Sequence, residues 1–252
     1  VKSVLDEHGI AMFTHEGAVT YMWPSWMFML LGQATDGKAV ETTFATLKGE
    51  MKFTDEPYLE AMSVLEKLGK EGYFINGVNA LDRQGALQSF INGEALFYYN
   101  CAFADTRKGG MGDELQITKG PLFCKEAQEG KVYTTGSASG CPLAIYSGTQ
   151  NLELSLKLVD WMSDPVNVVK WLHDYTDDQS IIKSYLAPQV NFERPADVEA
   201  DPLIDILTEQ NAGLEVWLDW YWPTDVATTF KEVLQAVIGG QLDAVTALET
   251  VQ

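Results

Sequence analysis

The sequence predicts an α/β fold, and two observations support that prediction. One is a helix, a stop and a strand in succession within residues 86–103, where apolar residues at 86, 87, 90 and 91 form one face of a helix. Asn92-Gly93 ends this helix, since glycine accepts a left-handed conformation without a steric penalty. The run from Glu94 to Tyr99 is apolar and aromatic, as expected of a strand buried on both faces. The other observation is a set of apolar stripes at helical spacing in the rest of the chain.

The first of these helices is predicted to begin at Trp23-Pro24, because proline suits the first turn of a helix, and its apolar residues continue to Leu31. A membrane-spanning helix needs roughly 20 apolar residues, so this short run is expected to line a core or a cleft. A second helix is predicted after the capping residues Asp55-Glu56-Pro57. Its apolar stripe consists of Tyr58, Met62, Leu65 and Leu68.

Further helices are predicted in the second half of the chain. One carries apolar residues at 152, 156, 159 and 162 and stops at Ser163-Asp164-Pro165, where another helix begins. Asp201-Pro202 has the composition of a helix start. Thr224 is expected to N-cap a helix that ends at Gly239-Gly240, and Asp243 is expected to start the last helix.

The composition favours a neutral ligand. The chain of 252 residues has a formal net charge of −19 and a pI of about 4.4, which argues against nucleic acid and anionic membrane surfaces as partners. Only three arginines are present, too few for a dedicated phosphate or carboxylate clamp to be expected. The 7 Trp, 11 Phe and 10 Tyr indicate that some aromatic residues serve a purpose other than packing. Solubility alone would also account for the acidity.

Neither the cysteines nor the histidines form a motif of metal or nucleophilic chemistry. Cys101, Cys124 and Cys141 lack CxxC spacing and neighbouring histidines, so no zinc site and no other cofactor are expected, and at most one disulfide can form. The three histidines lie outside any HExxH or Gly-x-Ser-x-Gly pattern. The sequence therefore gives no support to zinc or serine hydrolysis.

Residues 217–223, WLDWYWP, form the densest aromatic cluster of the chain. Its rings cannot all face one core from a single strand or helix, so some are expected to be exposed, and clustered exposed aromatic residues indicate binding. Two interpretations of the neighbouring carboxylates remain open. Asp219 and Asp225, with Glu215, could serve a glycosidase, or the same groups could bind sugar hydroxyls without any chemistry.

Short motifs in a fixed order resemble those of a known family. Four residues match its F-x-x-G-x-A-A-M signature: Phe90, Gly93, Ala95 and Leu96. Trp23-Pro24 matches an aromatic-Trp-Pro segment, and Ser163-Asp164-Pro165 matches a helix, Ser-x-Pro, helix segment. Residues 240–252 match the typical ending of the family. The chain thus resembles the extracellular solute-binding protein family 1, the sugar-binding proteins of ABC importers.

The resemblance implies a periplasmic-binding-protein type II fold, present here mainly as its C-terminal lobe. Residues 1–135 and 190–252 would form that lobe, and residues 136–189 would be a segment returning to the N-terminal lobe. The small residues Gly136–Gly140, which lead into an apolar run, would form the hinge crossing. Family members are normally longer, and the missing part is expected to precede Val1. Without it, the returning segment would need a rearranged fold or a second copy to bury its apolar helices.

The resemblance also implies a function, the substrate-binding component of an ABC importer that holds a neutral sugar or oligosaccharide in an interlobe cleft. The expected partners are this sugar and the permease subunits. The expected location is extracytoplasmic, in the periplasm or lipid-anchored on the outer face of the cell membrane. Ala18 stands where maltodextrin-binding members carry an acidic residue, so maltodextrin specificity is not implied. A glycoside-active enzyme and a non-catalytic adhesion or interaction module are the alternatives.

The expected ligand site combines stacking rings with groups that bind hydroxyls. In the family, an aromatic residue three positions past an asparagine at the strand end stacks on the sugar, and Phe103 stands at that place after Asn100. Phe103 and Trp23 could instead pack the lobe. No catalytic residue and no metal ligand are expected. The expected ligand-binding residues are Trp220, Tyr221, Trp222, Trp23, Phe103, Asn100, Asp219 and Ser137.

Overall fold

The computed structural model describes residues 1–99, 110–111, 114–116, 118, 120–131, 133, 143–164, 166–167 and 217–252. The strands in these ranges are β1 (Ala11–Thr14) and β2 (Ala95–Tyr98). The α-helices are α1 (Lys2–Glu7), α2 (Trp23–Ala34), α3 (Ala39–Leu47), α4 (Glu56–Lys70), α5 (Arg83–Ile91), α7 (Leu152–Ser163), α11 (Thr224–Ile238) and α12 (Ala244–Val251). The short 3-10 helices of the same ranges are η1 (Thr20–Met22), η2 (Val78–Ala80) and η5 (Leu218–Trp220). The predicted α/β class is confirmed.

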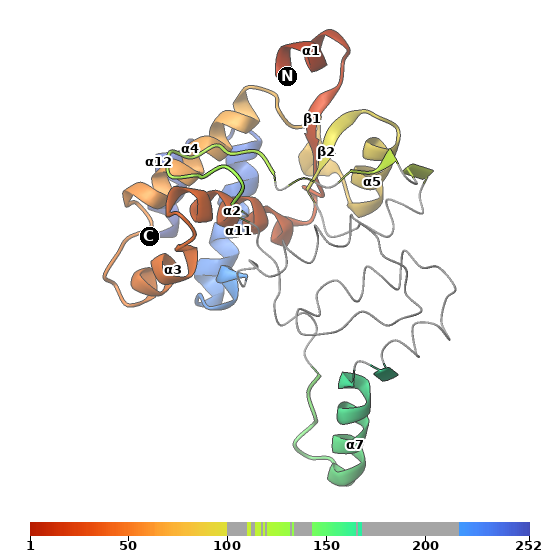
Figure 1. Cartoon of the computed structure of the whole chain (residues 1–252). Helices are drawn as coiled ribbons and strands as arrows, with labels where there is room; N and C mark the ends of the chain where they lie inside the picture. Colours follow the sequence, from red (N-terminus) through yellow and green to blue (C-terminus); the bar gives the residue numbers. More distant parts are fainter. Residues whose placement is uncertain are drawn as a thin grey trace.

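The two strands lie between a helical body and α5 (Figure 1). They pair in parallel, with Phe13 opposite Phe97 and Thr14 opposite Tyr98. Successive residues of a strand point to opposite faces. Phe13 accordingly packs its ring on Trp26 of α2 at a centroid distance of 5.0 Å. Thr14 points the other way, where its hydroxyl lies 2.8 Å from that of Ser89 on α5.

The core of the helical body is α2, in which every residue is buried. It packs against α4 and α11, and α12 packs against both of those helices (Figure 1). A helix that is apolar on all sides needs such complete cover. The expectation that this run belongs to a core is confirmed. No helix within the described ranges is long and apolar enough to cross a membrane.

The local signals for the ends of the helices were mostly right. Asp55 is the N-cap residue of α4, and the predicted stripe of that helix is buried. Asp243 caps α12, because its Oδ1 accepts a hydrogen bond from the backbone N–H of Thr246 at 2.9 Å. The prediction that Thr224 caps α11 is wrong. Pro223, extended at ψ 144°, takes the N-cap position, so Thr224 is already helical.

The prediction that β2 is buried on both faces is also wrong. Ala95 is buried, whereas Leu96 is 42% exposed. Leu96 lies on the same face as Tyr98, since residues two apart share a face. Phe90 of α5 packs on Tyr98 at 5.9 Å, so α5 covers that end of the strand and leaves Leu96 exposed.

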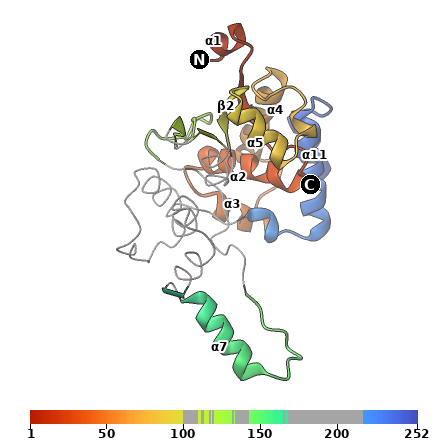
Figure 2. The ribbon, with the colours of Figure 1, turned by 90° about the vertical axis from the view of Figure 1, so that its right-hand side faces the viewer.

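The helix α7 stands away from the helical body in both views (Figures 1 and 2). It ends at Ser163 as predicted, but none of its residues is buried. Its large apolar residues are therefore exposed, including Leu154 and Trp161. The predicted division into residues 1–135 with 190–252 and residues 136–189 stays a prediction, because 134–142 and 168–216, with the expected hinge, lie outside the described residues.

Candidate functional site

A carboxylate lies where β1 and β2 end. Glu16 follows β1 by two residues, and its side chain is only 3% exposed. Its Oε1 accepts a hydrogen bond from the hydroxyl of Tyr98, the last residue of β2, at 2.8 Å. The same oxygen accepts from Nε of Arg83, the first residue of α5, at 3.3 Å. Because the carboxyl ends of parallel strands are where ligands bind in open α/β sheets, these three side chains mark one candidate site.

The residue before this carboxylate, His15, packs in a cluster of aromatic rings. The ring of His15 lies 4.6 Å from that of Trp23 and 6.2 Å from that of Trp26. Burial lowers the pKa of His15 from 6.5 to about 4, although the nearby backbone of Tyr99 and of Met22 acts in the opposite direction. The imidazole is therefore neutral at neutral pH, and this aromatic cluster carries no charge.

The aromatic segment 217–223 divides between core and surface, as predicted. Trp222 is only 6% exposed, and its ring packs on Phe28, Phe53 and Phe230 at centroid distances of 4.6–5.6 Å. Trp220 is 57% exposed and Tyr221 is 46% exposed. The buried Trp222 thus anchors the segment, and its two neighbours present rings to solvent.

Asp219 is buried beside these exposed rings. Its Oδ2 forms an ion pair with Nζ of Lys231 on α11 at 2.8 Å. Its Oδ1 is buried and makes no hydrogen bond to any of the described residues. A buried carboxylate needs such a partner, since leaving the charge unpaired would cost several kcal/mol. Asp225, by contrast, is exposed at the start of α11.

One face of α11 connects the strand ends with the aromatic segment. Gln235 of α11 donates its side-chain amide to the backbone oxygen of Gly17 at 2.8 Å. Lys231 stands one helical turn before Gln235, and residues four apart on a helix lie roughly 6 Å from one another. The backbone at Gly17 and the carboxylate of Asp219 are therefore both held by α11, through side chains one helical turn apart.

The structure places five of the eight residues predicted for the ligand site. Trp220 and Tyr221 are exposed, whereas Trp222 and Asp219 are buried next to them. Trp23 is fully buried, and its Nε1 donates to the backbone oxygen of Gly17 at 3.2 Å. Three further predicted residues lie outside the described part of the chain: Asn100, Phe103 and Ser137. Glu215, a carboxylate of the alternative glycosidase interpretation, lies outside it too.

Glu16, Arg83 and Tyr98 are not among the residues predicted from the sequence. The available signal was the apolar run at residues 10–13, which includes the first three residues of β1 and is followed at once by polar side chains. A polar residue directly after a buried strand is a candidate ligand-binding position in a parallel sheet. The run is short, so its apolar residues alone do not identify it as a strand of the sheet.

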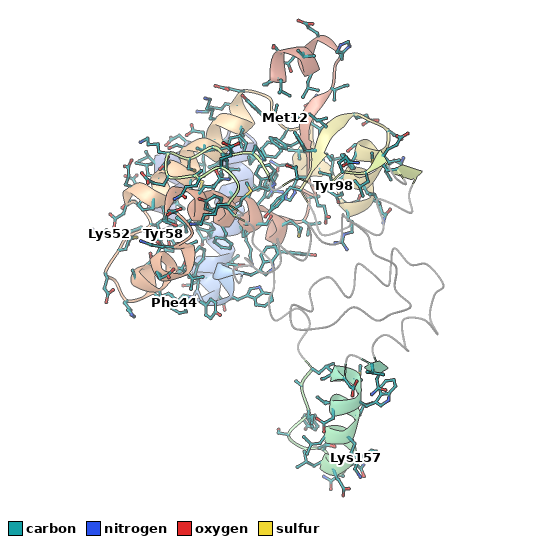
Figure 3. All side chains as sticks on the ribbon, viewed as in Figure 1. Met12, Phe44, Lys52, Tyr58, Tyr98 and Lys157 are labelled. Atoms are coloured by element: carbon teal, nitrogen blue, oxygen red, sulfur yellow. The ribbon has the colours of Figure 1, made fainter. Side chains whose placement is uncertain are left out.

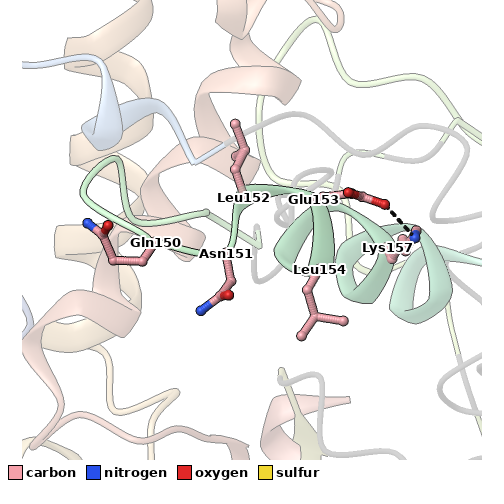
Figure 4. Close-up of a pocket in the computed structure, with 6 residues that line it drawn as sticks. All are labelled: Gln150, Asn151, Leu152, Glu153, Leu154 and Lys157. Carbon is pink, nitrogen blue, oxygen red and sulfur yellow. Dashed lines mark hydrogen bonds and ion pairs between the residues drawn. The ribbon is translucent and has the colours of Figure 1, made fainter.

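A hollow at the start of α7 is a poorer candidate (Figure 4). Its lining consists of Gln150, Asn151, Leu152, Glu153, Leu154 and Lys157. The ion pair of Glu153 with Lys157, at 2.7 Å, is exposed and therefore of little energetic value. No aromatic ring lines the hollow. Across the described ranges, no group of three or more His, Cys, Asp or Glu side chains is placed to hold a metal ion.

The chain has the fold of the periplasmic-binding-protein type II sugar binders, so the fold expectation is confirmed. It is similar to a chitin oligosaccharide binding protein, with 17% identity and a TM-score of 0.66 over 99% of this chain and 60% of that protein. It is similar to a protein from a structural account of xylan utilization by Caldanaerobius polysaccharolyticus, with 14% identity and a TM-score of 0.70 over 99% of this chain and 62% of that one. A third similar structure is the solute-binding protein RafE in complex with raffinose, with 15% identity and a TM-score of 0.64 over 99% of this chain and 62% of RafE.

This chain spans about 60% of the length of these proteins. No protein-family model and no curated protein sequence matches it.

Proposed function

We propose that this chain belongs to the substrate-binding component of an ABC importer and binds a neutral sugar or oligosaccharide without catalysis. The observation that supports it best is the exposure of Trp220 and Tyr221 beside Asp219 on this fold. The fold is that of proteins described as binding chitin oligosaccharide and raffinose. The net charge of −19 favours a ligand without negative charge.

The chemistry of these side chains suits a sugar. Aromatic faces contact the C–H faces of sugar rings, while carboxylate and amide groups bind the hydroxyls. Trp220 and Tyr221 supply the rings in this proposal, and Asn100 and Phe103 after β2 extend the site with one group of each kind. Ser137 would contribute a hydroxyl. Trp23 and Trp222, which are buried, would act by holding the backbone and rings of the site in place.

The strand-end carboxylate is a further part of the proposed site. Glu16 already accepts hydrogen bonds from Tyr98 and Arg83, so its position is fixed before a ligand arrives. Preorganised groups lose less conformational entropy on binding. We expect Glu16 and its two donors to set the orientation of a sugar hydroxyl or of the segment that follows Tyr98.

In this proposal the protein acts outside the cytoplasm, in the periplasm or lipid-anchored on the outer face of the cell membrane, and delivers the sugar to the permease subunits of its transporter. No specific observation favours the glycosidase alternative. Asp219 forms an ion pair with Lys231, and a general acid requires a free carboxyl group poised near the glycosidic oxygen.

The test is isothermal titration calorimetry of the full-length protein against raffinose, stachyose, chitin oligosaccharides and xylo-oligosaccharides. We expect at least one of them to bind, and we expect Trp220→Ala to weaken that binding by about fivefold or more. Each sugar is also incubated with the protein, and new reducing ends are counted. Failure of every sugar to bind would overturn the proposal, and hydrolysis that Asp219→Asn abolishes would replace it by the glycosidase.

A further inference from the structure

We propose that Phe44 of α3 forms a second stacking surface of the sugar site, continuous with the exposed rings of the aromatic segment. This inference rests on the proposed function and adds a residue that no sequence motif indicated. Phe44 is 39% exposed, and its ring lies 5.2 Å from that of Tyr221 at an angle of 56°. The two rings are thus in contact but tilted, so each keeps part of one face free. In both views α3 lies beside the N-terminal end of α11 (Figures 1 and 2).

Phe44 is not needed to pack α3 against the helical body. The buried residues of α3 are Ala39, Thr42 and Thr43, which face the core. Phe44 follows them on the outer side of the helix, at the edge of the helical body (Figure 3). A large aromatic residue exposed in contact with a second exposed ring indicates a binding surface more than a packing one.

The area of this surface decides what kind of partner fits. Three aromatic side chains of roughly 150–250 Å² each, about half exposed, offer on the order of 300 Å² of ring surface. One partner of a standard protein complex contributes about 800 Å², which is more than twice as much. The surface of Phe44, Tyr221 and Trp220 is therefore too small for a stable protein interface, and it matches a ligand of a few sugar rings.

Polar groups flank Phe44 where sugar hydroxyls would lie. Glu41 stands three residues before it and Lys48 four residues after it, positions that share a helix face with residue 44. Both side chains are exposed. One offers an acceptor and the other a donor, so a neutral ligand with many hydroxyl groups can pair with both.

The test measures the affinity of the full-length protein for the sugar it binds best, with Phe44 changed in three ways. Phe44→Ala and Phe44→Leu remove the ring, and we expect each to weaken binding by about fivefold or more. Phe44→Tyr keeps a ring of the same shape, and we expect it to bind within about twofold of the parent. Tyr146→Ala is the matched control, since Tyr146 is an exposed aromatic residue outside the site, and we expect it to bind like the parent. The melting temperature of each variant is measured alongside.

The outcomes distinguish a failure of this inference alone from a failure of the proposed function. If Phe44→Leu binds like the parent while Trp220→Ala weakens binding, the second stacking surface is refuted and the sugar site stands. If Phe44→Leu and Tyr146→Ala weaken binding equally, the effect is not specific to the surface and the inference is also refuted. If the parent binds no sugar, the proposed function and this inference fail together.

Discussion

Gln235 donates its side-chain amide to the backbone oxygen of Gly17 at 2.8 Å, although 218 residues separate the two in the sequence. The same oxygen accepts from Nε1 of Trp23 at 3.2 Å. Because Gln235 lies on α11 and Trp23 begins α2, a single peptide group joins the end of the sheet to two core helices. The backbone after β1 is therefore fixed by distant parts of the chain.

Gly17→Ala is expected to lower the free energy of unfolding. A Cβ atom at this position would lie 2.4 Å from the backbone oxygen of Val78, which is closer than packed atoms tolerate. Overpacking of this kind costs about 1–3 kcal/mol. Urea unfolding measures the change. Gly32→Ala is the control, since its Cβ would lie 3.6 Å from Tyr133, an ordinary contact, and it should be far less destabilising. Equal effects of both substitutions would show that the close approach at Gly17 is not the cause.

Because of His15, the free energy of unfolding is expected to decrease as the pH falls from about 6.5 to about 4. Burial lowers its pKa to about 4 from an unfolded value of 6.5, so the unfolded chain binds a proton in this range that the folded chain does not. The contribution of His15 to stability is therefore present above pH 6.5 and is lost toward pH 4. It amounts to about 2 kcal/mol between pH 7 and pH 5.

The measurement is urea unfolding of the parent and of His15→Phe at both pH values. The variant cannot take up this proton and should lose less stability on acidification than the parent, by about 2 kcal/mol. The control is His8→Gln, which changes an exposed histidine and should leave the pH dependence of the parent in place. An identical pH dependence in parent and His15→Phe would contradict the prediction.

Cys124 is expected to resist alkylation in the folded protein. Burial raises the pKa of its thiol to about 12, and the charge of Glu60 adds to the effect. Because the thiolate is the reactive form, little of it exists at pH 8. Incubation with iodoacetamide, followed by peptide mass spectrometry, should leave Cys124 unmodified in buffer and modify it in urea. Mapping by peptide separates it from Cys101 and Cys141, and rapid modification of Cys124 in buffer would show that it is accessible.

The helices of this protein could be predicted from the sequence because their signals are local. The stripe of Tyr58, Met62, Leu65 and Leu68 and the cap at Asp243 each lie within a few turns. The strand-end site could not be predicted in the same way. Glu16 meets Arg83 and Tyr98 across 67 and 82 residues of sequence, so the pairing of β1 with β2 and the packing of α5 on these strands are needed to bring them together.

The aromatic segment shows the same limit. The sequence indicated that its rings divide between core and surface, but it did not say which ring goes where. Trp222 is buried because its ring packs on Phe28 and Phe53, which are distant in the sequence, and on Phe230 of the adjoining helix α11. No local pattern indicates Phe44, since its contact with Tyr221 joins α3 to a segment far along the chain.

Lys231→Met is expected to destabilise the fold and to disturb the aromatic segment. The side chain of Asp219 is 3% exposed, and Nζ of Lys231 at 2.8 Å is its only partner among the described residues. Removing one member of a buried ion pair costs about 3–5 kcal/mol, because the remaining charge stays buried and unpaired. Adding Asp219→Asn to Lys231→Met removes that charge, so the double variant should regain part of the lost stability.

Urea unfolding of the two single variants and the double variant gives the coupling energy of the pair. Lys157→Met is the control, because Lys157 and its partner Glu153 are both mostly exposed and their ion pair should contribute little. The exposed Trp220 follows Asp219 directly, so its fluorescence should also change in Lys231→Met and not in the control. If Lys231→Met is as stable as Lys157→Met, the ion pair does not hold the segment, and Trp222 alone must anchor the exposed rings.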